Sequence, residues 1–173
     1  MKIHVEWCDK TGKTTLIKAL SKELDMEVVK FSQPKTDNVF NEYVEFFWTE
    51  KEIKKWLVKN DNIICDRSWI WEQIYGPIYR KKKMKKHEVK KLDLASLANW
   101  DIIIYCDTDK WTIKKKFIED WEDFTKLKDI GRIQRYYRKT LKTLRTPVIT
   151  YDWTIWNIES IIYLINILKW FES

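Results

Sequence analysis

Short apolar runs alternate along the chain with longer segments whose apolar residues recur every three or four positions. The short runs predict five β-strands, at residues 2–6, 27–31, 62–65, 101–106 and 147–150. The longer segments predict helices at residues 13–24, 38–48, 49–58, 69–79, 87–97, 110–118, 127–144 and 157–171. Strands separated by helices are typical of βαβ units. We therefore expect an α/β fold with a five-stranded parallel sheet covered by helices on both faces.

Polar residues follow four of the predicted strands, at 6–15, 32–35, 66–68 and 107–109. Ligands of open parallel sheets bind at the carboxyl ends of the strands, so the chemistry is expected in these segments. The strongest signal is Trp7-Cys8-Asp9-Lys10-Thr11-Gly12-Lys13-Thr14-Thr15, which nearly matches the phosphate-loop pattern GxxxxGK[ST] between a predicted strand and a predicted helix.

This loop predicts a site for ATP and Mg²⁺. Backbone N–H groups from Thr11 to Thr15 can surround a phosphate at the helix N-terminus. The Lys13 ammonium can neutralise the β- and γ-phosphates, and the Thr14 hydroxyl can bind magnesium. Trp7 stands where the pattern has its first glycine. We expect its indole to turn away from the phosphates, and either to pack on a neighbouring segment or to form one wall of the acceptor pocket.

Several motifs together resemble the thymidylate kinase family and the related viral and phage deoxynucleoside kinases. Residues 6–15 resemble the loop of thymidylate kinases, and Asp66-Arg67-Ser68 resembles their Asp-Arg-Tyr or Asp-Arg-Ser motif. Ile74-Tyr75-Gly76-Pro77 follows at a similar spacing. The stretch 120–124, followed by 133–137, resembles the short lid and the helix after it. The resemblance implies a three-layer P-loop kinase fold over a single domain, residues 1–173, and the family is often a homodimer.

The resemblance implies roles for matching residues. Asp9 would accept a hydrogen bond from the sugar 3′-hydroxyl, and Arg67 would hold the acceptor phosphate through its planar guanidinium. Asp66 would lie near magnesium, directly or through water. Tyr75 would pack against the deoxyribose, and Phe46 or Phe47 would stack on the base.

Cations near the transferred phosphate also follow from the resemblance. Some thymidylate kinases carry a catalytic arginine in the loop after the Asp, and here Lys10 occupies that position. Residues 110–131 contain no arginine, so lysines are the candidate lid cations, namely Lys114, Lys115, Lys116 and Lys126. Arg80 lies one helical turn after Gly76 and is expected to reach the active site.

The acceptor class turns on residue 33. Nucleoside kinases usually place a carboxylate after the second strand to deprotonate a sugar hydroxyl, whereas a monophosphate acceptor needs only positioning and charge neutralisation. Gln33 is no base, so we expect transfer to a deoxynucleoside monophosphate, dTMP to dTDP by the resemblance. The alternatives are a deoxynucleoside kinase, with Glu6 or Glu72 as base, and a non-catalytic P-loop protein that binds nucleotide or nucleic acid.

Composition and charge add little to this choice. The 173 residues carry a net charge of +7, which favours anionic ligands without choosing among them. The basic run Arg80–Lys86 contains no aromatic residue, so a nucleic-acid groove is not expected there. Cys8, Cys65 and Cys106 lack metal-site spacing, and the late apolar segment 161–168 is too short to span a bilayer. We expect reduced thiols and a cytoplasmic protein with no membrane partner.

Overall fold

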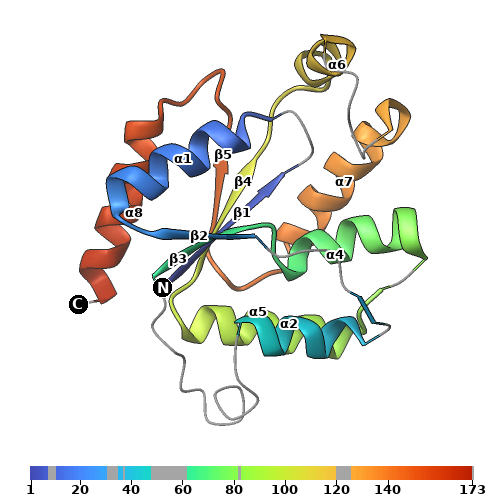
Figure 1. Cartoon of the computed structure of the whole chain (residues 1–173), viewed down its shortest axis with the longest axis horizontal. Helices are drawn as coiled ribbons and strands as arrows, with labels where there is room; N and C mark the ends of the chain where they lie inside the picture. Colours follow the sequence, from blue (N-terminus) through green and yellow to red (C-terminus); the bar gives the residue numbers. More distant parts are fainter. Residues whose placement is uncertain are drawn as a thin grey trace.

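A computed structural model describes residues 1–7, 11–30, 35–36, 38–47, 62–81, 83–119 and 126–172 (Figure 1). Several predictions fall outside these residues. They are the roles of Asp9, Lys10 and Gln33, the helix 49–58 and the lid 120–124. The stacking role of Phe46 and Phe47 is also untested, because their side chains lie outside the described part.

The five strands form one parallel sheet in the order β2-β3-β1-β4-β5. Strand β1 pairs with β3 on one side and with β4 on the other, so it is the central strand. The bounds agree with the prediction to within about one residue at each described end, and they are β1 Lys2–Trp7, β2 Glu27–Lys30, β3 Ile63–Asp66, β4 Ile102–Cys106 and β5 Val148–Tyr151. The predicted α/β fold with an all-parallel sheet is confirmed.

Seven α-helices lie in the described residues, namely α1 Lys13–Leu24, α2 Val39–Phe47, α4 Trp69–Tyr75, α5 Lys86–Ala98, α6 Lys110–Glu119, α7 Ile130–Leu141 and α8 Ile158–Glu172. Asn38 caps α2 as predicted, because its side-chain oxygen accepts a hydrogen bond from the Asn41 N–H. A 3₁₀ turn, η2 Leu127–Asp129, precedes α7.

Two helix predictions need correction. The segment 69–79 is an α-helix only to Tyr75 and continues as the π-helix η1, Gly76–Arg80. Pro77 has no N–H to donate, which explains why the α-helical hydrogen-bond pattern changes there. Helix α7 ends at Leu141 instead of residue 144, and the N–H groups of Arg145 and Thr146 donate to the Asp93 carboxylate.

The sheet separates two hydrophobic cores because side chains alternate along each strand. Ile3, Val5 and Trp7 of β1 point to the face covered by α1 and α8. Ile103 and Tyr105 of β4 point to the opposite face, covered by α2, α4, α5 and α7 (Figure 1). Cys65 and Cys106 are buried free thiols in β3 and β4. Among the described residues, no helix has the length and apolar character needed to cross a membrane.

Candidate functional site

The carboxyl end of β1 leads into the described part of the predicted phosphate loop. Gly12 caps the N-terminus of α1 with φ 81°, a left-handed conformation that glycine adopts without steric cost. A Cβ on Gly12 would lie 3.1 Å from the indole of Trp153, which belongs to the turn between β5 and α8. Both the backbone angle and the close approach of Trp153 therefore require glycine at this position.

Lys13 forms an ion pair with Asp66 at the carboxyl end of the neighbouring strand β3. Lys13 Nζ lies 2.6 Å from Asp66 Oδ1, and the two side chains are only 13% and 15% exposed. Burial lowers the pKa of the Lys13 ammonium, and the hydrogen bond and charge of Asp66 oppose that shift. The structure thus joins two predicted site residues that are 53 positions apart in the chain.

The oxygen ligands predicted for magnesium lie at the same edge. Thr14 and Thr15 are exposed in the first turn of α1, and Thr11 is buried. No group of three His, Cys, Asp or Glu residues able to hold a metal occurs in the described part of the chain. Magnesium bound with a nucleotide takes most ligands from water and phosphates, so a hydroxyl and one carboxylate fit its chemistry. Thr14 and Asp66 are the residues that would hold it.

Arg67 follows Asp66 with φ 78°, an unusual conformation for a residue with a side chain. Its N–H donates to the Val5 carbonyl at 3.4 Å, which ties this turn to β1. The Arg67 guanidinium lies between two indoles, with Cζ 5.5 Å from the ring centroid of Trp7 and 4.9 Å from that of Trp71. Residues held in such backbone conformations cluster at active sites and ligand-binding segments.

A second guanidinium, that of Arg80, lies over Trp71. The Cζ atom of Arg80, in η1, lies 4.9 Å from the ring centroid of Trp71. Arg80 Nη2 also donates to Glu72 Oε2, and the Glu72 side chain is fully buried. Arg67 and Arg80 thus contact one indole, and the role of Arg80 in an active site stays a prediction.

Glu6 is buried beneath this edge on the opposite face of β1 from Trp7. Its Oε1 accepts hydrogen bonds from the Ser68 N–H at 2.7 Å and the Ser68 hydroxyl at 2.5 Å, and its Oε2 accepts one from the Tyr137 hydroxyl at 3.1 Å. Burial raises the pKa of Glu6 to about 8, although these hydrogen bonds partly oppose the shift. The Ser68 hydroxyl also accepts from the Ile70 N–H and caps α4. Glu6 therefore acts as an anchor for the Asp-Arg-Ser turn.

Tyr75 lies deeper than the predicted sugar contact suggested. Its ring is 1% exposed and stacks on Trp71 at 4.8 Å and on Tyr79 at 5.8 Å between ring centroids. Tyr137 meets it edge-on at 6.5 Å. In this structure Tyr75 packs against Trp71, the ring that both Arg67 and Arg80 contact. The contact of Tyr75 with deoxyribose stays a prediction.

The candidate lid lysines differ in their surroundings. Lys116 Nζ lies 4.0 Å from the ring centroid of Trp153, close to Gly12, whereas Lys114 lies over the exposed ring of Trp111. Lys115 and Lys126 are exposed. Of the four, Lys116 is the one joined through Trp153 to the phosphate loop.

Three tryptophans lie in the candidate site, and two of them were not expected there from the sequence. Trp7, Trp71 and Trp153 contact Lys13, Arg67, Arg80 or Gly12. The position of Trp7 within the loop pattern was a signal for one of them. Nothing in the sequence distinguishes Trp71 and Trp153 from the rest of the eleven tryptophans, and only the fold brings them to the candidate site.

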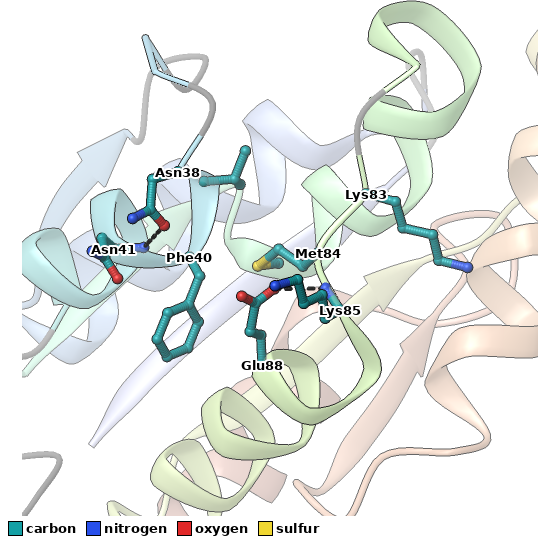
Figure 2. Close-up of a pocket in the computed structure, with 8 residues that line it drawn as sticks. Asn38, Phe40, Asn41, Lys83, Met84, Lys85 and Glu88 are labelled. Carbon is teal, nitrogen blue, oxygen red and sulfur yellow. Dashed lines mark hydrogen bonds between the residues drawn. The ribbon is translucent and has the colours of Figure 1, made fainter.

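The middle of the basic run connects η1 to α5, and the described lysines of the run are exposed. Lys81, Lys83, Lys85 and Lys86 are exposed, and Met84 is buried in the core. Part of the run borders an open cavity of about 530 Å³, whose lining includes neither Lys13 nor Arg67 (Figure 2). The cavity is lined by Asn38, Val39, Phe40, Asn41, Lys83, Met84, Lys85 and Glu88. Figure 2 shows Lys83 extending away from the α2 residues, and Glu88 Oε2 accepting a hydrogen bond from the Lys85 N–H.

Comparison with solved structures identifies proteins of the same architecture. The YorR protein from Bacillus subtilis, in complex with phosphorylated GDP, matches with a TM-score of 0.77 and 20% identity over 96% of each chain. Deoxyadenosine kinase from M. mycoides with bound dCTP matches with a TM-score of 0.60 and 19% identity, over 96% of this chain and 99% of that one. Polyphosphate kinase 2 from Arthrobacter aurescens TC1 matches with a TM-score of 0.61 and 12% identity, over 97% of this chain and 66% of that one.

The chain has the fold of these proteins. At such low identity the likeness shows the architecture alone. No family model and no curated protein matches the sequence. The thymidylate kinase resemblance, the homodimer and the cytoplasmic location stay predictions.

Proposed function

We propose that this protein transfers a phosphoryl group from Mg–ATP to a deoxynucleoside monophosphate, with dTMP to dTDP as the expected reaction. One observation carries the proposal. Lys13 of the predicted phosphate loop and Arg67, directly after β3, lie over the indole of Trp7, and Arg80 lies over the indole of Trp71. Three cations at the carboxyl edge of a parallel sheet suit two phosphate-bearing ligands better than one.

The donor side of the proposed site consists of the loop and α1. Lys13 would leave Asp66 for the β- and γ-phosphates, because a polyphosphate offers it more negative charge than one carboxylate. Asp66 and Thr14 would then hold magnesium, which neutralises the phosphate charge when bound. Trp153 contacts Gly12, so its indole would flank the bound donor.

The acceptor side consists of Arg67 and Arg80. Both guanidiniums contact Trp71, and each has buried nitrogen atoms without a hydrogen-bond partner in the described structure, namely Arg67 Nε, Arg80 Nε and Arg80 Nη1. Buried donors of this kind are costly unless an acceptor meets them, and a phosphate dianion supplies several acceptor oxygens. This supports a phosphate on the acceptor.

The proposed transfer then needs no strong base. An oxygen of the acceptor phosphate attacks the γ-phosphorus of the donor, the bond from that phosphorus to the β–γ bridging oxygen breaks, and ADP leaves with the electron pair. Lys13 and the lid lysines, Lys116 first among them, would neutralise the charge on the transferred group. Lys10 keeps its proposed role in the loop.

The second candidate is a deoxynucleoside kinase, favoured by the deoxyadenosine kinase of similar architecture. That reaction needs a carboxylate base. Glu6 is a poor one near neutral pH, because burial raises its pKa to about 8 and keeps it protonated. Glu72 is the better candidate, since its carboxylate is paired with Arg80 beside Arg67.

A coupled assay of ADP release over nucleosides and their monophosphates tests the choice. We expect deoxynucleoside monophosphates, dTMP first, to be the best acceptors by kcat/KM. Faster turnover of nucleosides would support the second candidate. Inorganic polyphosphate belongs in the donor panel, because one protein of this architecture is a polyphosphate kinase. Absence of turnover with every donor and acceptor, in a protein that binds ATP, would support the non-catalytic alternative.

A further inference from the structure

The tryptophan at the first position of the loop pattern touches both the donor-side and the acceptor-side cation. Lys13 Nζ lies 3.5 Å from the ring centroid of Trp7. Arg67 Cζ lies 5.5 Å from the same centroid. An ammonium or guanidinium within about 6 Å of an indole centroid is attracted by the negative potential of the ring face. Trp7 therefore interacts with Lys13 and Arg67 at once.

Trp7 is fixed on all sides. Its side chain is 3% exposed and belongs to the core between the sheet and α1 and α8. Its backbone pairs with Cys106 of β4 in the register of the sheet. An indole held by a core and by strand pairing cannot rotate freely, so the position of its ring face is set by the fold. The cations that rest on it are positioned relative to the sheet.

The two cations need such support because little else in the described structure holds them together. Lys13 has Asp66 as its carboxylate partner, and that carboxylate is the residue proposed to turn to magnesium. Arg67 contacts Trp7 and Trp71, and its Nε has no hydrogen-bond partner in the described part of the chain. Two like charges repel each other strongly when they are partly buried, and an aromatic ring attracts both.

We propose that Trp7 is a positioning residue whose indole keeps Lys13 and Arg67 beside the same ring, also when Lys13 exchanges Asp66 for a phosphate, and so limits the distance between donor and acceptor phosphates. This inference rests on the proposed phosphoryl transfer for its role in turnover. The ring acts through the two cations and does not itself contact the reacting atoms. Glycine at this position offers no such support, and in its place the chain uses an aromatic face.

Three substitutions distinguish an effect of the aromatic ring face of Trp7 from an effect of the volume that its side chain fills. Trp7→Phe keeps an aromatic face, Trp7→Leu fills part of the space without one, and Trp69→Leu removes a buried indole of the other core. We expect Trp7→Leu to lower kcat/KM at least about tenfold, with most of the loss in kcat, because misplaced reactants slow the chemical step. Trp7→Phe and Trp69→Leu should stay within about threefold. Circular dichroism sets a temperature at which every variant is folded.

Equal effects of Trp7→Leu and Trp7→Phe on turnover would overturn the inference and leave the proposed function standing. A cycle with Lys13→Met adds a readout independent of turnover. We expect Trp7→Leu to weaken ADP binding about fivefold by calorimetry in the natural background and to have no effect once Lys13→Met is present.

The binding cycle also tells the two proposals apart. Weaker ADP binding by Trp7→Leu, without any turnover in the natural protein, would support the inference and reject the proposed function. Unchanged ADP binding in Trp7→Leu would reject the inference whatever the turnover. If the natural protein bound neither ADP nor inorganic triphosphate, both proposals would fall together, since Lys13 would then hold no phosphate.

Discussion

Lys13 and Asp66 link the phosphate loop to the neighbouring strand through a contact of 2.6 Å between Nζ and Oδ1. The two residues belong to separate motifs. The parallel pairing of β1, which precedes Lys13, with β3, which ends at Asp66, brings these motifs side by side. An ammonium held by one carboxylate is ready to move to a more highly charged partner without crossing bulk water. The contact is therefore compatible with a site in which Lys13 exchanges Asp66 for a polyphosphate when that ligand binds.

Lys13→Ala should abolish phosphoryl transfer, because the developing charge on the transferred group would lose its main side-chain cation. We expect kcat to fall by at least about a thousandfold, the scale of losing a positioned charge in an active site. Steady-state ADP release measures the change. Lys18→Ala, an exposed lysine of the same helix, is the matched control and should leave kcat unaltered. Activity of Lys13→Ala within tenfold of the natural protein would reject the loop assignment.

Arg67→Ala should cost about 3 kcal/mol in kcat/KM for the monophosphate, the scale of a charged and positioned contact, while ATP binding persists. Arg132→Ala removes an exposed arginine of α7 and serves as the control. Equal loss of ATP binding would show that Arg67 belongs to the donor side.

Arg67→Gly adds a test of the strained backbone. At φ 78° glycine is unstrained, so this variant should be more stable to urea than Arg67→Ala by about 1 kcal/mol, while its kcat/KM falls as far as that of Arg67→Ala. A lower stability of Arg67→Gly would mean that the residue leaves the left-handed conformation in solution.

Gly12→Ala should weaken ATP binding, because alanine at φ 81° is strained and its Cβ would press on Trp153. We expect a rise in the calorimetric Kd of at least about tenfold, or 1.4 kcal/mol. Gly131→Ala is the natural control, since its Cβ would meet only the flexible end of Lys110 at ordinary contact distance. If both variants bind ATP like the natural protein, the conformation of Gly12 has no part in donor binding.

Glu6→Gln should change how the free energy of unfolding depends on pH. In the folded protein the pKa of Glu6 is raised to about 8, so between the ordinary value of 4.5 and 8 the folded state keeps a proton that the unfolded state has lost. The contribution of this proton to stability is complete below 4.5 and is lost as pH rises toward 8, with a slope of at most about 1.4 kcal/mol per pH unit.

Urea unfolding of both proteins at several values between pH 5 and 9 measures this effect, and the difference between them cancels other titrating groups. Glutamine cannot ionise, so the free energy of unfolding of Glu6→Gln should rise relative to that of the natural protein as pH rises. This difference should stop growing near pH 8. A difference that does not vary with pH would mean that Glu6 titrates normally.

The sequence by itself determined the order of strands and helices in the described residues and indicated the sheet edge of the candidate site. Alternating strands and helices are local patterns, and burial of strands on both faces leaves a clear apolar signal, so the parallel sheet was predictable. Helix α1 was predicted with its observed bounds, since Gly12 and the apolar face of Leu16, Ile17 and Leu20 mark it. The sequence also predicted Lys13, Asp66 and Arg67 at the carboxyl ends of β1 and β3, and the structure brings these three side chains together there.

Tertiary structure alone decided which side chains meet there. The Tyr137 hydroxyl donates to Glu6 from 131 positions away, and Trp153 contacts Gly12 from the far end of the chain. Such contacts depend on the order of the strands and on how the helices pack over them. The local spacing of apolar residues in the sequence predicts neither. Charge and exposure follow from the same packing. From the sequence a glutamate is expected to be an exposed carboxylate. In the fold, burial raises the pKa of Glu6 to about 8 in spite of the hydrogen bonds from Ser68 and Tyr137, because a low-dielectric surrounding disfavours the charged form.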